Sequence, residues 1–96
     1  MVFESNEIRV TDGEGPAFEA AFTRARQLLL RIPGCRSAEL LRRIGEPGRY
    51  QVRIGWERLE DHVEIYPGTA EAAEIRALLA PLIAGIDRSH CEPVPF

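Results

Sequence analysis

The sequence predicts one α+β domain, spanning residues 1–96, with the element order β-α-β-β-α-β of a ferredoxin-like fold that has an antiparallel sheet. Three features lead to this prediction. The segment RYQVRIGW alternates apolar and polar residues, as an amphipathic strand does. The segment FEAAFTRARQLLLRI repeats apolar residues at three- and four-residue steps, as a helix does. The segments DGEGP, GEPG and PGT supply turns between such elements.

The composition is that of a folded protein and argues against several functional classes. Hydrophobic residues make up 45% of the chain and charged residues 28%, which is typical of a single domain with one core. The net charge of −3 argues against nucleic-acid binding, and no run of about 18 apolar residues predicts a membrane span. The start, MVFESNEIRV, shows no secretory signal, so we expect a cytoplasmic protein with Cys35 and Cys91 reduced.

The first part of the chain predicts a strand followed by a long helix. In NEIRVT, residues 6–11, Ile8 and Val10 fall on one face and charged residues on the other. After the turn, Pro16 suits the first helical position. The apolar stripe then continues to Ile32, where the segment IPG ends the helix, because a residue before proline disfavours helical geometry.

The middle of the chain predicts a hairpin. Residues 35–44 alternate loosely, residues 45–48 form the turn, and residues 49–56 form the clearest strand in the sequence. One face of that strand carries Tyr50, Val52, Ile54 and Trp56, and the other carries Arg49, Gln51, Arg53 and Gly55. One face is therefore available to the helices, and the other needs a different cover.

The last part predicts a broken helical region and a final strand. In residues 59–66, the apolar stripe is formed by Leu59, His62, Val63 and Tyr66, and the polar side by Glu60, Asp61 and Glu64. Thr69 is suited to cap a second helix, and Pro81 to bend or end it. The final strand is expected over residues 86–92.

His62 is the first candidate for a functional side chain, because it lies on the apolar stripe and needs a polar partner there. It is a core histidine bonded to a backbone carbonyl, a histidine at a cavity wall that is ready to accept a proton near neutral pH, or an exposed histidine. Asn6 either orients a phenol or carbonyl in a pocket or ties down the start of the first strand. Tyr50 and Trp56 lie on the same face of one strand, at alternate positions, which is typical of core aromatic residues.

Other chemistry finds little support in the sequence. Phe22 is a core residue or a cavity-lining residue. His90 and Cys91 point to opposite faces of their strand, so they cannot share a metal ion, and no metal site is predicted. Hydrolase and nucleotide-binding motifs are absent.

The segments NEIRV, FEAAF, IPGC, EPGRYQVRIGWERLEDH and HCEPV stand in an order and spacing that resemble the antibiotic biosynthesis monooxygenase-like family. The resemblance covers nearly the whole chain and is most specific from Pro47 to His62. It implies a ferredoxin-like protomer whose sheet packs against that of a second copy. We therefore expect a homodimer, in the form of a dimeric α+β barrel.

The resemblance also implies an activity. Some members of this family oxidise phenols or quinols with O2 and use no metal or flavin. By this resemblance the chain is a cofactor-independent monooxygenase acting on a small aromatic ligand. His62 would be the base or the orienting donor, and Asn6, Trp56 and Tyr66 would hold the ring. Phe22 and Tyr50 complete the set of candidate ligand-binding residues.

Two functional alternatives stay open at this point, besides a structural dimer whose filled core leaves no cavity of useful size. Another branch of the family degrades haem with an asparagine, a tryptophan and a histidine. Asn6 fits the asparagine, but Ile65 and Ile75 stand where the tryptophan and the histidine are expected, which disfavours haem degradation. The other alternative is a dimeric ligand-binding or accessory protein without turnover.

Overall fold

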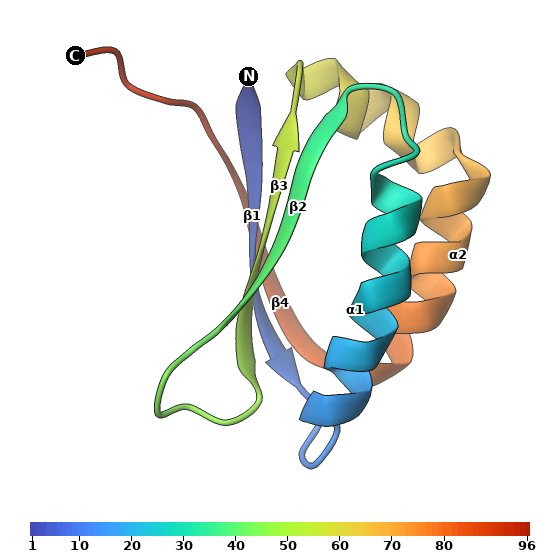
Figure 1. Ribbon diagram of the computed structural model, residues 1–96, viewed down its shortest axis with the longest axis vertical. Coiled ribbons are helices and arrows are strands. Elements are labelled where there is room, and N and C mark those ends of the chain that lie inside the picture. Colours follow the sequence, from blue (N-terminus) through green and yellow to red (C-terminus); the bar gives the residue numbers. More distant parts are fainter.

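The computed structural model describes residues 1–96 and arranges them in two layers, with both main helices on one face of a four-stranded sheet (Figure 1). The elements are β1 (Val2–Val10), α1 (Gly15–Leu29), β2 (Cys35–Arg42), β3 (Arg49–Trp56), α2 (Ala70–Leu79) and β4 (Ile83–Cys91). The strand order is β2-β3-β1-β4, and every neighbouring pair is antiparallel. The predicted ferredoxin-like β-α-β-β-α-β order is thereby confirmed.

The core lies between the sheet and the helices, as the alternating strand patterns require. β1 pairs with β3 and with β4, so that Ile8 stands opposite both Tyr50 and Ile86. The inward face of β3 is fully buried, and α1 contributes Phe18 and Phe22 against it. Ile8, Tyr50 and the two phenylalanines belong to one contiguous hydrophobic cluster, whereas Ile86 is half-exposed.

Several element boundaries differ from the predicted ones. β2 ends at Arg42 rather than at residue 44, and β4 spans Ile83–Cys91 rather than residues 86–92. β1 begins at Val2 rather than at residue 6, since the segment VFES also pairs with β3 and β4 although it places an acidic residue inward. α1 ends at Leu29 rather than at Ile32, because the last backbone N–H groups bond three residues back and tighten the chain into a turn.

The segment between β3 and α2 is not the α-helix that its spacing suggests. It forms a π-helical turn, η1 (Asp61–Ile65), in which the N–H of Tyr66 bonds the carbonyl of Asp61, five residues back. This wider turn changes which side chains face the core. Val63 is 47% exposed, against the prediction, whereas Asp61 is buried instead of facing water. Leu59, predicted inward, is also exposed.

Asp61 is buried because the loop before β2 leaves room for it. Gly34 adopts a φ of +88°, and a Cβ at that position would collide with the Asp61 carboxylate. That carboxylate accepts the backbone N–H of Arg58 at 3.0 Å and pairs with its guanidinium at 3.2 Å. These contacts fix the start of η1 next to the end of β3.

The second helix begins as predicted. The Thr69 hydroxyl accepts the backbone N–H of Ala72 at 3.0 Å, which is a normal N-cap. Ala72 and Ile75 face the core. Neither this helix nor any other in the structure combines the length and the apolar character that a membrane crossing requires.

Candidate functional site

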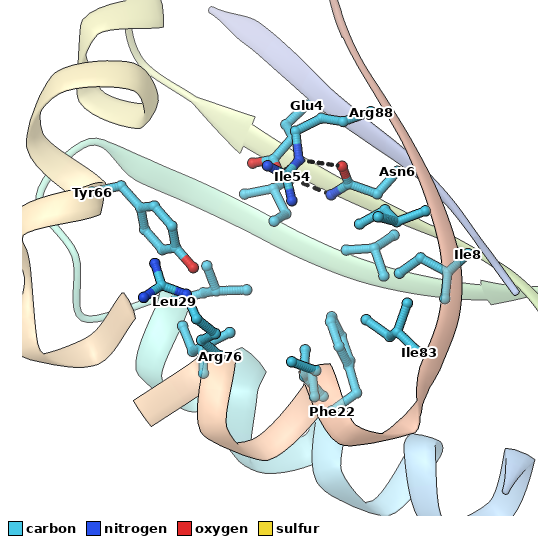
Figure 2. A pocket seen from close by; sticks show the side chains of 15 residues that line it. Glu4, Asn6, Ile8, Phe22, Leu29, Ile54, Tyr66, Arg76, Ile83 and Arg88 are labelled. Atoms are coloured by element: carbon cyan, nitrogen blue, oxygen red, sulfur yellow. Dashed lines mark hydrogen bonds and ion pairs between the residues drawn. The ribbon is translucent and has the colours of Figure 1, made fainter. Parts of the chain in front are cut away.

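A cavity of about 340 Å³ lies between the sheet and the two helices, lined by 15 residues of which 11 are hydrophobic (Figure 2). Phe22 of α1, Ile54 of β3 and Ile75 of α2 form part of its apolar wall. Two polar groups interrupt this wall. One is the cluster of Glu4, Asn6 and Arg88, and the other is the pair Tyr66 and Arg76.

The cluster is centred on Glu4, a carboxylate that is only 4% exposed. Its Oε2 accepts the Asn6 side-chain N–H at 2.8 Å, and its Oε1 accepts the indole N–H of Trp56 at 3.1 Å. Arg88 Nε donates to Asn6 Oδ1 at 2.9 Å and lies 3.4 Å from Glu4 Oε2. Strand pairing brings these residues together, because Asn6 stands opposite Arg88 across β1 and β4.

His62 lies behind this carboxylate. Its Nε2 is 3.1 Å from Glu4 Oε1, its Nδ1 is 2.8 Å from His90 Nε2, and its ring stacks on Trp56 with 5.3 Å between centroids. Burial lowers the pKa of His62, the charge of Glu4 opposes this effect, and the neighbouring His90 and Arg88 add to it.

The hydrogen bonds assign the tautomers of both imidazoles. A neutral His62 donates Nε2–H to the Glu4 carboxylate, so its Nδ1 accepts a proton that His90 Nε2 carries. His90 is exposed on the edge strand β4. The chain of groups from Glu4 through His62 to His90 therefore connects the cavity wall to solvent.

The structure separates the candidate residues into three places. Asn6, Phe22 and Tyr66 line the cavity. Trp56 and His62 contact Glu4 from behind and are outside the lining. In this position His62 bonds two side chains, rather than the backbone carbonyl expected of a core histidine.

Tyr50 is the candidate farthest from this group. Its hydroxyl donates to Glu19 of α1 at 2.6 Å, and its ring packs against Phe18 with 5.1 Å between centroids. Burial, together with the hydrogen bond to Glu19, raises the pKa of Tyr50. Tyr50 does not line the cavity.

Four polar residues of the site were not among the sequence candidates: Glu4, Arg76, Arg88 and His90. A signal for the first was present, since Glu4 lies two residues before Asn6 and so on the same inward face of β1. An acidic residue on an inward strand face is unusual and points to a polar site.

The pKa of the Tyr66 hydroxyl shows how the surroundings of the cavity affect the ionisation of a phenol. Burial raises the pKa of the Tyr66 hydroxyl, the negative charge of Glu4 adds to this, and Arg88 and Arg76 oppose it. A phenol, whose pKa is about 10 in water, needs a base to lose its proton at neutral pH, and burial of this kind does not favour its ionisation.

The lining offers few ligands for a metal or haem. Haem iron in proteins is held by histidine, cysteine, methionine or tyrosine, and of these types only Tyr66 lines the cavity. No group of three or more His, Cys, Asp or Glu side chains is placed to hold a metal ion. The polar end, with a carboxylate, an amide and a guanidinium, suits a ring that carries a hydroxyl or carbonyl.

Comparison with known proteins places the chain among related sequences and structures. Residues 1–78 match the family model described as antibiotic biosynthesis monooxygenase. A crystal structure from Bordetella bronchiseptica that carries this family name is 30% identical, with a TM-score of 0.92 over 98% of this chain and 97% of the other.

Two further solved structures are informative. SnoaB, a cofactor-independent oxygenase from Streptomyces nogalater, is 19% identical, with a TM-score of 0.87 over 99% of this chain and 94% of its own, and at that identity it shows a shared fold alone. The heme-degrader MhuD from Mycobacterium tuberculosis, solved with two hemes in its active site, is 29% identical. Its TM-score is 0.80, over 100% of this chain and 98% of its own.

Proposed function

The chain belongs to the antibiotic biosynthesis monooxygenase family, and we propose that it is a cofactor-independent monooxygenase that oxidises a small phenol or quinol with O2. One observation carries the proposal: an apolar cavity of about 340 Å³ has in its wall the buried pair Glu4 and Asn6, which is bonded by the half-exposed Arg88. A cavity of this size accommodates a small aromatic ring, and the cluster gives the ring's oxygen a fixed position.

In the proposed complex, the ring lies against Phe22 and the isoleucines of the wall, and its hydroxyl faces Glu4 and Asn6. The hydroxyl donates to the Glu4 carboxylate, while the Asn6 amide and the Arg88 guanidinium offer hydrogens to the same oxygen as it becomes negative. Tyr66, whose hydroxyl points into the cavity in Figure 2, closes one side.

The base in this proposal is Glu4, and His62 is the orienting donor. Because a buried phenol does not ionise by itself at neutral pH, the leaving proton needs an acceptor within hydrogen-bond distance. Glu4 lines the cavity and His62 does not. The N–H groups of Trp56 and His62 both bond Oε1 of Glu4, which holds the carboxylate in one orientation.

The reaction balances without a further electron donor. A phenol with a ring hydrogen and O2 give a quinone and water, so the substrate supplies the electrons and both of the water's hydrogens. The site accepts the hydroxyl proton, orients the ring and excludes solvent. We propose no metal or flavin.

Haem degradation is the weaker assignment for this chain. MhuD is described as a heme-degrader, but here Ile75 occupies the cavity wall, and the histidines bond each other behind Glu4. A haem iron would find only the Tyr66 hydroxyl among its usual ligand types in the lining. The residues present do not fit the group.

We also propose that the functional unit is a homodimer formed through the free face of the sheet. Both helices cover the other face (Figure 1), so this one has no cover within the chain. It carries Leu41, which is 38% exposed, beside the exposed pair Arg53 and Glu39. Analytical ultracentrifugation at micromolar concentration tests this, and a sedimentation coefficient of a monomer would contradict it.

A non-catalytic ligand-binding protein is the second candidate. The observation in its favour is that every buried polar side-chain atom already has a hydrogen-bond partner within the chain. Such a satisfied site can hold a guest without a reaction. A compound that raises the thermal stability of the protein and is recovered unchanged in air would favour this function.

Oxygen uptake with a panel of quinols tests the proposed reaction. The wild-type protein should consume O2 above the rate without protein, and Glu4→Gln should lower that rate about 100-fold, as loss of a general base does. His62→Ala should lower it less. Glu46→Gln, a charge-matched change at an exposed turn position, is the control. Equal rates for wild type, Glu4→Gln and His62→Ala would end the proposal.

A further inference from the structure

The second polar group of the cavity consists of Tyr66 and Arg76. Tyr66 closes one side of the proposed complex, whereas Arg76 has no role in the oxidation proposed above. Arg76 belongs to α2 and is exposed, yet it also lines the cavity, so it stands where the cavity opens to solvent. Figure 2 shows its guanidinium near the Tyr66 hydroxyl, and its charge acts on that hydroxyl.

Arg76 differs from most arginines of this chain in having no carboxylate partner. Of the 12 basic residues, all of which are arginine, seven pair with an acidic side chain. The Arg76 side chain takes part in no hydrogen bond or ion pair of the structure. Its five N–H donors are therefore free to bind a planar anion.

The charges of the cavity lining do not cancel. The lining contains three charged residues, namely Glu4, Arg76 and Arg88. Glu4 and Arg88 lie 3.4 Å apart and offset each other. Arg76 leaves an excess of one positive charge in the lining, although the chain as a whole carries a net charge of −3.

We propose that Arg76 determines substrate specificity by binding a carboxylate of the ligand, so that the substrate is a hydroxylated aromatic acid. This deepens the proposed function and rests on it. The ligand's hydroxyl faces Glu4 and Asn6, and its carboxylate reaches the cavity mouth, where the Arg76 fork and the Tyr66 hydroxyl donate to it. Arg88 does not serve this purpose, because it lies in the Glu4–Asn6 cluster, where the ligand's hydroxyl is placed.

Binding measurements under nitrogen test this without turnover. The probes are 4-hydroxybenzoate and 6-hydroxy-2-naphthoate, each compared with its neutral amide in isothermal titration calorimetry. The acids differ in the distance between hydroxyl and carboxylate, so that one of them can span the gap between the Glu4 cluster and Arg76. The wild-type protein should bind at least one acid about 10- to 100-fold more tightly than its amide, the range of one charge-assisted hydrogen-bonded pair.

Variants at position 76 identify the residue responsible. Arg76→Gln should remove the preference, because it lowers the affinity for the acid and leaves the affinity for the amide unchanged. Arg76→Lys should keep part of the preference. Arg31→Gln removes a charge from an exposed arginine that also lacks an acidic partner and does not line the cavity, so it should bind as the wild type does.

Three results would overturn the inference: no binding of either acid, equal binding of acid and amide, or a preference that survives in Arg76→Gln. Its failure is distinct from that of the proposed function. A preference that depends on Arg76 in a protein that consumes no O2 would uphold the carboxylate site and reject the oxidation. If the protein consumed O2 only with neutral quinols, the oxidation would be upheld and the carboxylate site rejected.

Discussion

Replacing Glu4 with glutamine tests the organisation of the site, because the change keeps the side chain's shape and removes one acceptor. Oε1 of Glu4 accepts from Trp56 and His62, and Oε2 accepts from Asn6 and interacts with Arg88. A glutamine has one oxygen, so its NH2 must face one of these two sets of donors. The indole N–H on one side and the guanidinium on the other can only donate.

In either orientation at least one hydrogen bond between buried groups is lost. The expected cost is about 1–3 kcal/mol of the free energy of unfolding, the usual penalty for a buried polar group without its partner. Arg88 is half-exposed, so we add nothing for its lost attraction to Glu4. Out of the roughly 5–15 kcal/mol typical of a domain, this loss is measurable and leaves the protein folded.

Urea unfolding followed by tryptophan fluorescence measures this cost. Trp56 is the only tryptophan and is fully buried next to Glu4, so its emission reports directly on the site. Glu46→Gln, in the exposed turn between β2 and β3, should change the free energy of unfolding by less than about 0.5 kcal/mol. If Glu4→Gln were as neutral as this control, the carboxylate would not be accepting these bonds, and the reasoning would be refuted.

Two further predictions follow from the shifted pKa values. Because burial lowers the pKa of His62 in the folded state, the unfolded chain takes up a proton as pH falls below about 6.5 while the folded protein stays neutral. The stability advantage of wild type over His62→Gln is thus present above pH 6.5 and declines as the pH falls towards 5. Urea unfolding at pH 7.5 and 5 measures it, and a constant difference would contradict the assignment. Burial also raises the pKa of Cys35 from 9.0 to about 11, so in a Cys91→Ser variant its alkylation by iodoacetamide at pH 8 should be about 100-fold slower in the folded than in the unfolded protein. Equal rates by mass spectrometry would show that the thiol is not buried.

The fold could be predicted from the sequence because its strongest signals are local. The alternation in residues 49–56 predicted the bounds of β3 correctly, and Thr69 caps α2 as its residue type indicates. Where the prediction was wrong, the cause was also local: a π-helical turn replaced the α-helical spacing, so that Asp61 turned inward and Val63 outward.

The site was less predictable because its polar groups meet through long-range pairing. Glu4 and Asn6 come from β1, whereas Arg88 and His90 come from β4, and only the register of these strands makes them neighbours. No sequence spacing reports that His62 Nδ1 bonds His90 Nε2. The sequence drew attention to Asn6 and His62. Glu4, which bonds both of them, was not singled out, although its place two residues before Asn6 puts it on the same inward face.

The most direct test of the account is a crystal structure of the protein with hydroquinone, grown and frozen without O2. The account predicts that the ring occupies the cavity against Phe22, with one hydroxyl in hydrogen-bond distance of the Glu4 carboxylate or the Asn6 amide. A ring bound outside this cavity, or bound inside it with neither hydroxyl near Glu4 or Asn6, would contradict the central claim.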